Sequence, residues 1–552
     1  MRVHGESGIP EGSWDFWKTL FEAFSKTGRT IEIYMHAKGV NQTMIDIGVA
    51  TGMPIKLGAK YSAEHQSLGY NQADIRALEI PKNNGHADNT PFSLSSGARS
   101  FTRYGYADFF HEGSKAKILY RLWPGTQRHL LSADPEMAAA YGRTSHFCGA
   151  DGIDLMEPMT FKGREGSGHA GSRCAYSDAA LNPKYDYQKY EYYYRVWGRK
   201  LYNPDTPLEA TRRGLRTTFG IGADPVETAL ACSSRILPLV TSAHLVSASN
   251  HDWWAEINTN MPIAQTAAGR LFFDSPAPRC FETVSPLDPQ IFSTVVEHVQ
   301  DLLNGNVSPK YSPVEVAQWI DSLVASSTQA LSAARTKTRG LTTPEFRRIE
   351  EDILIMNGVG GYYAGQMRSA TYYEIFKQTG NVKAGELALD QYKKARDVWA
   401  KMAERASKVY VADVSYGSTP IRRGNWMERL PAIDSDLDSM QKSLASPPAA
   451  SGAADKAEQA IKAATTPPQR TADTAHHAPA SAFKPGKPLT VTLQGAHSAS
   501  ALLHYRHVNQ GERWLSMDMQ SGAGGYTASI PGAYTDSPYP LEYYFELRGG
   551  SN

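Results

Sequence analysis

Short apolar runs alternate with helical hydrophobic patterns along the first third of the chain. The runs that are typical of strands lie at residues 1–5, 30–36, 53–60, 117–123 and 152–157. Apolar residues recur at helical spacing in the segments 14–26, 43–50 and 134–147. In the last of these, Asp134 is a candidate N-cap and Pro135 suits the first helical position. This alternation predicts a parallel sheet with helices packed outside it.

We interpret residues 1–184 as the C-terminal part of a (β/α)8 TIM barrel, an α/β fold. A closed barrel of this kind needs eight strands, whereas the pattern here predicts five. The first of them begins at Met1, without a preceding cap or tail. We therefore expect a chain that lacks the N-terminal strands of its barrel.

Helical patterns then follow one another through residues 185–442 and predict an all-α domain. The predicted helices lie at 185–201, 207–219, 225–239, 289–303, 312–335, 344–378 and 382–409. Ser312 and Glu315 form a capping box at the start of one of them.

The last part of the chain changes character twice. Residues 443–487 are rich in Pro, Ala and Ser, which predicts a mobile linker with one short helix at 453–464. Residues 488–552 show period-2 apolar runs separated by Gly and Pro. These runs predict a small fibronectin-like β-sandwich that is incomplete at its end.

Composition and charge narrow the classes of partner. The 552 residues carry a formal net charge of +1 and no basic or acidic block, so we expect no nucleic-acid partner. No apolar run of about 18 residues is present, so we expect no membrane partner. The four cysteines lie far apart, match no zinc pattern and are expected to be buried thiols.

Charged and aromatic side chains gather at the predicted carboxyl ends of the strands, where a (β/α)8 barrel places its active site. In chain order they are Arg2, His4, Glu6, His36, Lys38, Lys60, Tyr61, Glu64, His65, Arg121, Trp123 and Glu157. Hydrolysis of a glycosidic bond needs two carboxyl groups, one acid and one base or nucleophile. Glu6, Glu64 and Glu157 follow three different strands and are the catalytic candidates.

Basic residues at these strand ends suit an acidic sugar. Arg2, Lys38, Lys60 and Arg121 are expected to bind hydroxyl groups or a uronate carboxylate through charge-assisted hydrogen bonds.

The histidines and aromatic residues have other expected roles. His4, His36 and His65 match no metal-binding pattern, so we expect them to hydrogen-bond sugar hydroxyl groups. Stacking on sugar rings is expected of Tyr61, Trp123 and Trp253, the last in a polar-aromatic loop of the helical region.

Two stretches resemble the α-glucuronidases that act on xylan-derived sugars. Gly198-Arg199-Lys200-Leu201-Tyr202-Asn203-Pro204-Asp205 is similar to the "GR-x-x-W-N-P-D" sequence that follows the last barrel strand in that family. Arg2-x-x-x-Glu6-Ser7-Gly8-Ile9-Pro10 resembles its "K-x-x-x-E-G-x-P" sequence at the general acid. The resemblance implies a barrel followed by a helical domain, with Glu6 as the acid.

The chain departs from this family at three positions. Tyr61 falls near the place of a family aspartate, and Glu64 lies three residues further on. Trp123 falls in the region where the family has a second carboxylate. His36 and Lys38 lie nearest to the family's uronate-binding arginine. The departures leave the substrate and the catalytic base open.

The sequence therefore favours a glycoside hydrolase that cleaves O-glycosidic bonds of a plant or algal polysaccharide or oligosaccharide. We expect an α-glucuronidase-like, inverting reaction with Glu6 as the acid and Glu64 or Glu157 as the base, and neither a metal nor a cofactor. We expect a secreted or periplasmic bacterial protein, although no signal peptide opens the chain. Two alternatives stay open: a non-catalytic carbohydrate-binding protein, and a polysaccharide lyase with Tyr61 and His65 as base and acid.

Overall fold

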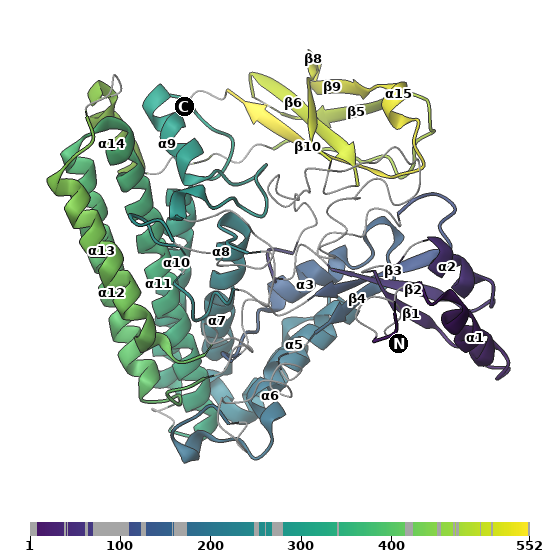
Figure 1. The fold of residues 1–552 in the computed structure, drawn as a ribbon, viewed down its shortest axis with the longest axis horizontal. Coiled ribbons are helices and arrows are strands. Elements are labelled where there is room, and N and C mark those ends of the chain that lie inside the picture. The colour runs from purple at the N-terminus through teal and green to yellow at the C-terminus, as the bar shows by residue number, and fades with distance from the viewer. Residues whose placement is uncertain are drawn as a thin grey trace.

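A computed structural model describes residues 8–549 of the chain, apart from several gaps. The gaps are residues 11, 38–39, 41, 61–64, 70–109, 123–128, 157, 159–173, 248–252, 260, 268–279, 339–341, 415–422, 450–453, 467–469, 471–473, 497 and 509–511. Figure 1 shows three parts: a parallel sheet with its helices, a group of long helices, and a β region near the C-terminus.

The first part is a four-stranded parallel sheet in the order β1-β2-β3-β4. Its strands are β1 (Ile33–His36), β2 (Ile55–Lys60), β3 (Ala116–Leu122) and β4 (Gly152–Leu155). Helix α1 (Trp14–Ser25) precedes β1, α2 (Gln42–Val49) lies between β1 and β2, and α3 (Pro135–Thr144) lies between β3 and β4. This confirms the predicted mixed α/β alternation. The strand predicted at 1–5 lies outside the described residues, and closure into a barrel stays a prediction.

Helix α3 begins as predicted, with Asp134 as its N-cap and Pro135 at its first position. The Asp134 carboxylate accepts a hydrogen bond from Glu136 N at 3.1 Å, and Pro135 occupies the first helical position. A side-chain oxygen at the N-cap satisfies one of the backbone N–H groups that the first turn leaves without a partner.

Side chains alternate between the two faces of the parallel sheet, and one face is apolar. Leu57 illustrates the register, since it pairs with Met35 of β1 and Ile118 of β3. This face and the surrounding helices share one core, which includes Ile33, Met35, Ile55, Leu57, Ile118, Tyr120 and Leu122 of the strands, Trp17 and Phe21 of α1, Met44 and Ile45 of α2, and Tyr141 of α3. The helices therefore cover the apolar face, and the polar groups lie on the opposite face.

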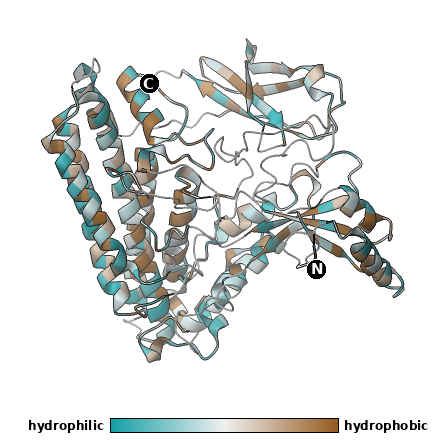
Figure 2. Cartoon of the chain, in the orientation of Figure 1, coloured by the Kyte–Doolittle hydropathy of each residue, from teal (hydrophilic) through white to brown (hydrophobic). Residues whose placement is uncertain are grey.

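The second part is helical. Its α-helices are α5 (Glu191–Tyr202), α6 (Leu208–Phe219), α7 (Ala223–Ser234), α8 (Ile236–Ala243), α9 (Val295–Asn304), α10 (Pro313–Lys337), α11 (Pro344–Thr379), α12 (Val382–Ser407), α13 (Leu430–Ala445) and α14 (Ala457–Thr465). The long helix α11 packs against α10 and α12, and Figure 2 shows hydrophobic and hydrophilic residues alternating along α12 and α13 at the edge of the molecule. The predicted capping box is present, because Glu315 N donates to Ser312 Oγ at 3.2 Å and Ser312 N donates to Glu315 Oε2 at 2.8 Å.

Within the described residues, no helix combines the length and the apolar character needed to cross a lipid bilayer.

One helical segment differs from the prediction. The helix predicted at 225–239 is divided into α7 and α8 at Arg235. Pro238 explains the break, because a proline ring clashes with the carbonyl four residues earlier, here that of Ser234. The short helix predicted at 453–464 within the Pro-rich stretch is present as α14, and its Ala457, Ala460, Ile461 and Ala464 join the core of the helical part.

The C-terminal β region consists of two three-stranded antiparallel sheets, in the orders β10-β6-β7 and β5-β9-β8. Its elements are β5 (Leu489–Gln494), β6 (Ser500–His507), β7 (Leu515–Asp518), β8 (Gln520–Gly522), β9 (Gly525–Ile530), the short α15 (Gly532–Thr535) and β10 (Leu541–Arg548). Val491 and Ile530 of one sheet and Leu503 of the other belong to the same hydrophobic cluster. The region meets the parallel sheet near the start of β3, where Glu112 N donates to Pro538 O at 2.9 Å.

Candidate active site

The polar face of the parallel sheet is the candidate site. In register, it comprises Tyr34 and His36 of β1, Lys56, Gly58 and Lys60 of β2, Lys117, Leu119 and Arg121 of β3, and Gly152 and Asp154 of β4. Parallel sheets generally bury apolar side chains on both faces, so a face with this many charged groups needs a reason other than packing. In a (β/α)8 barrel the inward-facing residues near the carboxyl ends of the strands line the active site.

A hydrogen bond on this face joins the first strand to the last. The Tyr34 hydroxyl donates to Asp154 Oδ2 at 3.3 Å, although β2 and β3 lie between their strands. In a flat sheet three strand spacings would separate β1 from β4 by about 14 Å, which is too far for these two side chains. The sheet therefore curves toward its polar face, as the wall of a barrel does.

Gly58 makes room for this contact. A Cβ atom at this position would lie 2.6 Å from Tyr34 Cζ and 3.0 Å from Arg121 Cδ. Arg121 Nε in turn lies 3.8 Å from Asp154 Oδ2. Burial raises the pKa of Tyr34, and Asp154 adds to the effect while Arg121 opposes it, so the Tyr34 hydroxyl remains a hydrogen-bond donor.

At the amino ends of the strands, the polar face is neutralised by acidic residues. Lys56 Nζ lies 2.8 Å from Glu32 Oε2 and 3.2 Å from Asp151 Oδ2. The hydrogen bond with Glu32 is the main reason that the pKa of Lys56 is raised. This end of the face thus carries a matched set of charges.

At the carboxyl ends, basic side chains are enclosed. His36 ends β1 and is 5% exposed, and Lys60 ends β2 and is 6% exposed. Arg121 pairs with Lys60 in the register, and its Nη2 lies 3.5 Å from Met156 Sδ just beyond β4. Three adjacent strands therefore deliver three basic residues to one end of the polar face.

His65 follows β2 in the sequence and contacts the helical part. It is fully buried, and its ring meets Trp253 edge-on with 5.4 Å between the ring centres. Two residues later, Ser67 N donates to the Tyr141 hydroxyl at 3.1 Å, and Leu68 N donates to Ser242 Oγ at 3.1 Å. The segment after β2 is thus fixed between α3 and α8.

The segment after β3 is held by buried acidic side chains of the helical part. His129 N donates to Glu256 Oε1 at 3.0 Å and Leu130 N to Glu256 Oε2 at 3.4 Å. Leu131 N donates to Asp352 Oδ2 at 2.7 Å. Both carboxylates are fully buried. The helical part therefore sets the position of the backbone that follows the strand carrying Arg121.

A second contact fixes the end of the same segment at Asp134, where α3 begins. Arg235, at the break between α7 and α8, binds Asp134 through two hydrogen bonds, Nε to Oδ2 at 2.6 Å and Nη2 to Oδ1 at 3.0 Å. The Asp134 hydrogen bond raises the pKa of Arg235. Asp134 thus caps α3 and joins it to the helical part.

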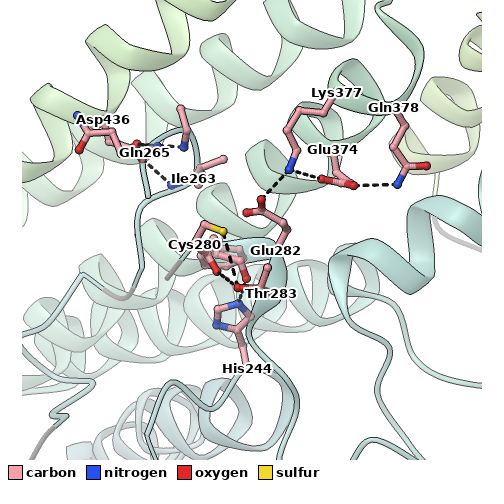
Figure 3. Close-up of polar contacts among 12 residues, drawn as sticks. His244, Ile263, Gln265, Cys280, Glu282, Thr283, Glu374, Lys377, Gln378 and Asp436 are labelled. Atoms are coloured by element: carbon pink, nitrogen blue, oxygen red, sulfur yellow. Dashed lines mark hydrogen bonds and ion pairs between the residues drawn. The ribbon is translucent and has the colours of Figure 1, made fainter. Parts of the chain in front are cut away.

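The loop between α8 and α9 supplies Trp253 and Glu256, and Figure 3 shows polar contacts that fix it. Lys377 of α11 lies 2.6 Å from Glu282 of this loop and 2.8 Å from Glu374 of its own helix. Burial disfavours the charge on Lys377, but the hydrogen bonds to Glu282 and Glu374 raise its pKa overall. Lys377 therefore bridges the loop to the core helix.

Two further contacts hold the same loop. The Asp436 carboxylate of α13 accepts from Ile263 N at 2.6 Å and from Gln265 N at 2.8 Å. His244 stacks on Phe281, and its Nε2 lies 2.9 Å from Phe281 O. Burial lowers the pKa of His244 to about 4, so this histidine is neutral at physiological pH.

The structure brings some of the predicted site residues together and separates others. His36, Lys60 and Arg121 share the polar face, whereas His65 and Trp253 meet at the junction with the helical part. The other predicted site residues lie outside the described residues: Arg2, His4, Glu6, Lys38, Tyr61, Glu64, Trp123 and Glu157. Trp253 is 1% exposed, so its ring packs the junction instead of presenting the open face that stacking on a sugar requires.

Tyr34, Gly58 and Asp154 belong to the polar face but were not predicted as site residues. A sequence signal for them exists, because residues two positions apart on a strand point to the same face. Tyr34 lies two residues before His36, and Gly58 lies two residues before Lys60. A search two residues back from each predicted strand-end residue would have identified both Tyr34 and Gly58.

Comparison with solved structures shows a similarity of fold. No protein-family model and no curated protein matches this chain. Among solved structures, the chain is similar to a protein described as a GH138 enzyme targeting pectin rhamnogalacturonan II. The TM-score is 0.59 and the sequence identity is 12%, over 80% of this chain and 61% of that protein. This chain thus spans less than two thirds of the length of the protein it matches.

At this identity the match shows similarity of fold. It supports a glycoside hydrolase-like α/β fold, which is the coarser part of the resemblance inferred from the sequence. It does not extend to the α-glucuronidases that act on xylan-derived sugars.

Proposed function

We propose that this protein is a glycoside hydrolase whose substrate lies against the polar face of the parallel sheet. The observation that carries the proposal is the face itself, on which His36, Lys60 and Arg121 lie at or next to the carboxyl ends of three adjacent parallel strands. Packing alone would favour apolar residues there, and strand ends of this kind are where (β/α)8 enzymes bind their substrates. The similarity of fold to a GH138 enzyme supports the proposal.

The proposed substrate is an acidic sugar in a plant or algal polysaccharide or oligosaccharide. Lys60 and Arg121 are largely shielded from solvent, since the side chain of Arg121 is 12% exposed and Lys60 as a residue is 6% exposed. A shielded cation binds a carboxylate more strongly than an exposed one, because water screens it less. α-Glucuronidase-like cleavage is the narrower form of the proposal, and such a substrate implies a secreted or periplasmic enzyme.

Glu6, Glu64 and Glu157 are the proposed catalytic carboxylates, with Glu6 as the acid. Glu64 follows the end of β2 by four residues and Glu157 follows the end of β4 by two. In the sequence, both glutamates therefore follow strands that contribute to the polar face. Carboxyl groups about 6.5–9.5 Å apart across the mouth of the barrel would leave room for the water that an inverting hydrolase uses.

A non-catalytic carbohydrate-binding protein is the second candidate, and one observation favours it. The residues of β3 on the polar face are Lys117, Leu119 and Arg121, and none of these is a carboxylate. The family resemblance places a catalytic carboxylate on the corresponding strand. Binding would then depend on the same basic residues without hydrolysis.

The test is to incubate the full chain with pectic oligosaccharides and with neutral plant oligosaccharides, and to follow new reducing ends by chromatography. We expect cleavage of uronate-containing oligosaccharides without the ultraviolet absorbance of the unsaturated product that a lyase would form. Glu6→Gln should lower the rate by about 10²–10⁴-fold, the usual contribution of a positioned acid. Glu64→Gln and Glu157→Gln identify the base, since only one of them should cause a comparable loss.

Lys60→Met provides the test of the acidic substrate. It should raise KM for uronate-containing oligosaccharides and leave that for neutral ones unchanged. If the protein binds these oligosaccharides and cleaves none of them, the second candidate holds. If all three glutamine variants turn over substrate at the wild-type rate, the proposed carboxylates are wrong.

A further inference from the structure

The outward surface of α5 carries a shallow groove that the proposed active site does not use. The groove has a volume of about 450 Å³ and is lined by Tyr187, Glu191, Tyr194, Arg195, Gly198 and Arg199. α5 lies at the lower centre of Figure 1, beside α6. Its lining comes from the helix and from the turn that precedes it, all of which the structure describes.

Helical geometry separates this surface from the buried side of α5. Glu191, Arg195, Gly198 and Arg199 are exposed, and they recur at intervals of three and four residues. Val196, Trp197 and Lys200 lie on the other side and are buried. Helix α5 thus has a buried half and an exposed half, and packing accounts for the buried half alone.

Gly198 is the floor of the groove. A Cβ atom at this position would meet nothing within 4 Å, so no neighbouring side chain requires a glycine there. Glycine in the middle of a helix is less stable than alanine. The residue therefore weakens α5 without a packing benefit, and its effect is to keep the floor of the groove clear.

Aromatic rings stand at one end of the groove. Tyr185 and Tyr187 are 52% and 50% exposed and stack in parallel, with 5.9 Å between the ring centres and 10° between the ring planes. Exposed aromatic rings of this size are the typical anchors of binding surfaces. Stacking holds the Tyr187 ring in place before any ligand arrives, which reduces the entropy lost on binding.

Positive charge lies at the other end. Glu191 and Arg195 neutralise each other through a hydrogen bond from Arg195 Nη2 at 2.5 Å. Arg199 forms no ion pair with any residue that the structure describes. A planar guanidinium group suits a carboxylate, which it can bind through two parallel hydrogen bonds.

We propose that this groove is an accessory binding site for a uronate-containing polysaccharide chain. A sugar ring stacks on Tyr187, the chain lies across Gly198, and a carboxylate pairs with Arg199. The proposal rests on the proposed function for its substrate class, and it adds a second contact with the polymer away from the polar face of the sheet. Such a site raises the effective concentration of polymer at the enzyme without changing the chemistry.

The test measures binding of the full chain to polygalacturonate by affinity electrophoresis and calorimetry, with an uncharged galactan as the comparison polymer. Tyr187→Ala and Gly198→Glu should each weaken polygalacturonate binding about tenfold, because one removes the stacking ring and the other fills the floor and adds negative charge. Arg199→Ala should weaken it about threefold at low salt. Arg213→Ala is the matched control, since Arg213 is an exposed arginine of α6 outside the groove, and it should bind as wild type does.

Activity separates this site from the proposed active site. The groove variants should cleave short oligosaccharides at the wild-type rate and show a raised KM on the polymer. If Lys60→Met loses all polymer binding while the groove variants bind as wild type does, the groove proposal is wrong and the proposed function stands.

Two other outcomes are informative. If no variant or wild-type protein cleaves any substrate, but the groove variants lose polygalacturonate binding, the groove proposal stands and the hydrolase proposal fails. If size-exclusion chromatography shows a wild-type dimer that Tyr187→Ala dissociates, with polymer binding unchanged, the surface is an interface between two copies of the chain and the proposal is overturned.

Discussion

Two regions of the molecule enclose charged side chains, and they differ in how acidic groups are paired with basic ones. Where the helical part holds the segment after β3, Asp134 and Asp352 each accept a backbone N–H and pair with a cation, Arg235 and Lys189 respectively. On the polar face of the parallel sheet, Lys56 pairs with Glu32 and Asp151 at the amino ends of the strands, whereas the carboxyl ends bring His36, Lys60 and Arg121 together with Asp154. The first region matches each carboxylate with a cation and a backbone N–H, whereas the carboxyl end of the second has more basic than acidic groups among the described side chains.

The difference indicates two uses for buried charge. A carboxylate matched by a backbone N–H and a cation fixes the path of the chain, and its removal leaves charged and polar groups without their partner. The proposed function assigns the basic side chains at the ends of the parallel strands to a ligand that brings negative charge. Substitutions in the first region should therefore reduce stability, and substitutions in the second should mainly reduce binding.

The largest loss of stability is expected from substitution of Asp352, a buried carboxylate of the first region. Asp352→Ala removes the carboxylate that lies 3.1 Å from Lys189 and accepts from Leu131 N and the Tyr410 hydroxyl. Breaking a buried ion pair of this kind costs about 3–5 kcal/mol. The free energy of unfolding, measured in urea, should fall by that amount.

Asp321→Ala is the control for this experiment. Asp321 pairs with Arg368 at the surface, with a side chain that is 49% exposed. Surface ion pairs contribute about 0–1 kcal/mol, so this variant should unfold close to wild type. An Asp352→Ala protein as stable as the Asp321→Ala protein would remove the distinction between the two regions.

A smaller loss of stability is expected at Gly58, on the polar face itself. Gly58→Ala places a methyl group against Tyr34 and Arg121, and overpacking of this kind costs about 1–3 kcal/mol. It should also weaken binding of acidic oligosaccharides, because Arg121 must move. Thermal unfolding and calorimetric binding measure the two effects separately.

Gly198→Ala is the matched glycine control. The added methyl group meets nothing within 4 Å in the middle of α5, so the variant should gain up to about 1 kcal/mol of helix stability. If Gly58→Ala and Gly198→Ala change the stability equally, the polar face has room for a methyl group at position 58, and the expected overpacking against Tyr34 and Arg121 does not occur.

The smallest effect concerns the histidines that the helical part buries without charge. Burial lowers the pKa values of His244 and His298 to about 4. A lowered pKa means that the unfolded chain takes up a proton first, so the stability is complete above about pH 6.5 and is lost as the pH falls toward 4. Each histidine should account for about 1–2 kcal/mol of destabilisation between pH 7 and pH 5.

Urea unfolding of wild type and His298→Leu at pH 7, 6 and 5 tests this linkage. The variant should show a shallower loss of stability with falling pH, because leucine cannot be protonated. Parallel pH profiles for the two proteins would mean that His298 is charged in the folded state at pH 5, contrary to its burial.

Much of the fold could be predicted from the sequence because its signals are local. Hydrophobic spacing predicted β1 to β4, and the Asp134-Pro135 pair predicted the start of α3. The capping box at Ser312 and the long helices that follow it were predicted in the same way. Such signals depend on residues within one or two turns of each other, which the sequence contains in full.

The candidate site could be predicted only in part, for a physical reason. The alternation of a strand places His36, Lys60 and Arg121 at strand ends, and parallel pairing then brings them to one end of the sheet. Nothing local indicates that Trp253 is enclosed against His65, because its burial depends on a segment nearly 200 residues earlier in the chain.

The sequence by itself thus determined the identity and order of the strands and helices and the basic character of the strand ends. Only the tertiary structure decided that Tyr34 reaches Asp154, 120 residues further along the chain, and that Asp352 holds the backbone of Leu131. The physical reason is that secondary structure follows from interactions between near neighbours. These contacts depend instead on the curvature of the sheet and on how the helices pack against it, which are set by the sum of many distant interactions.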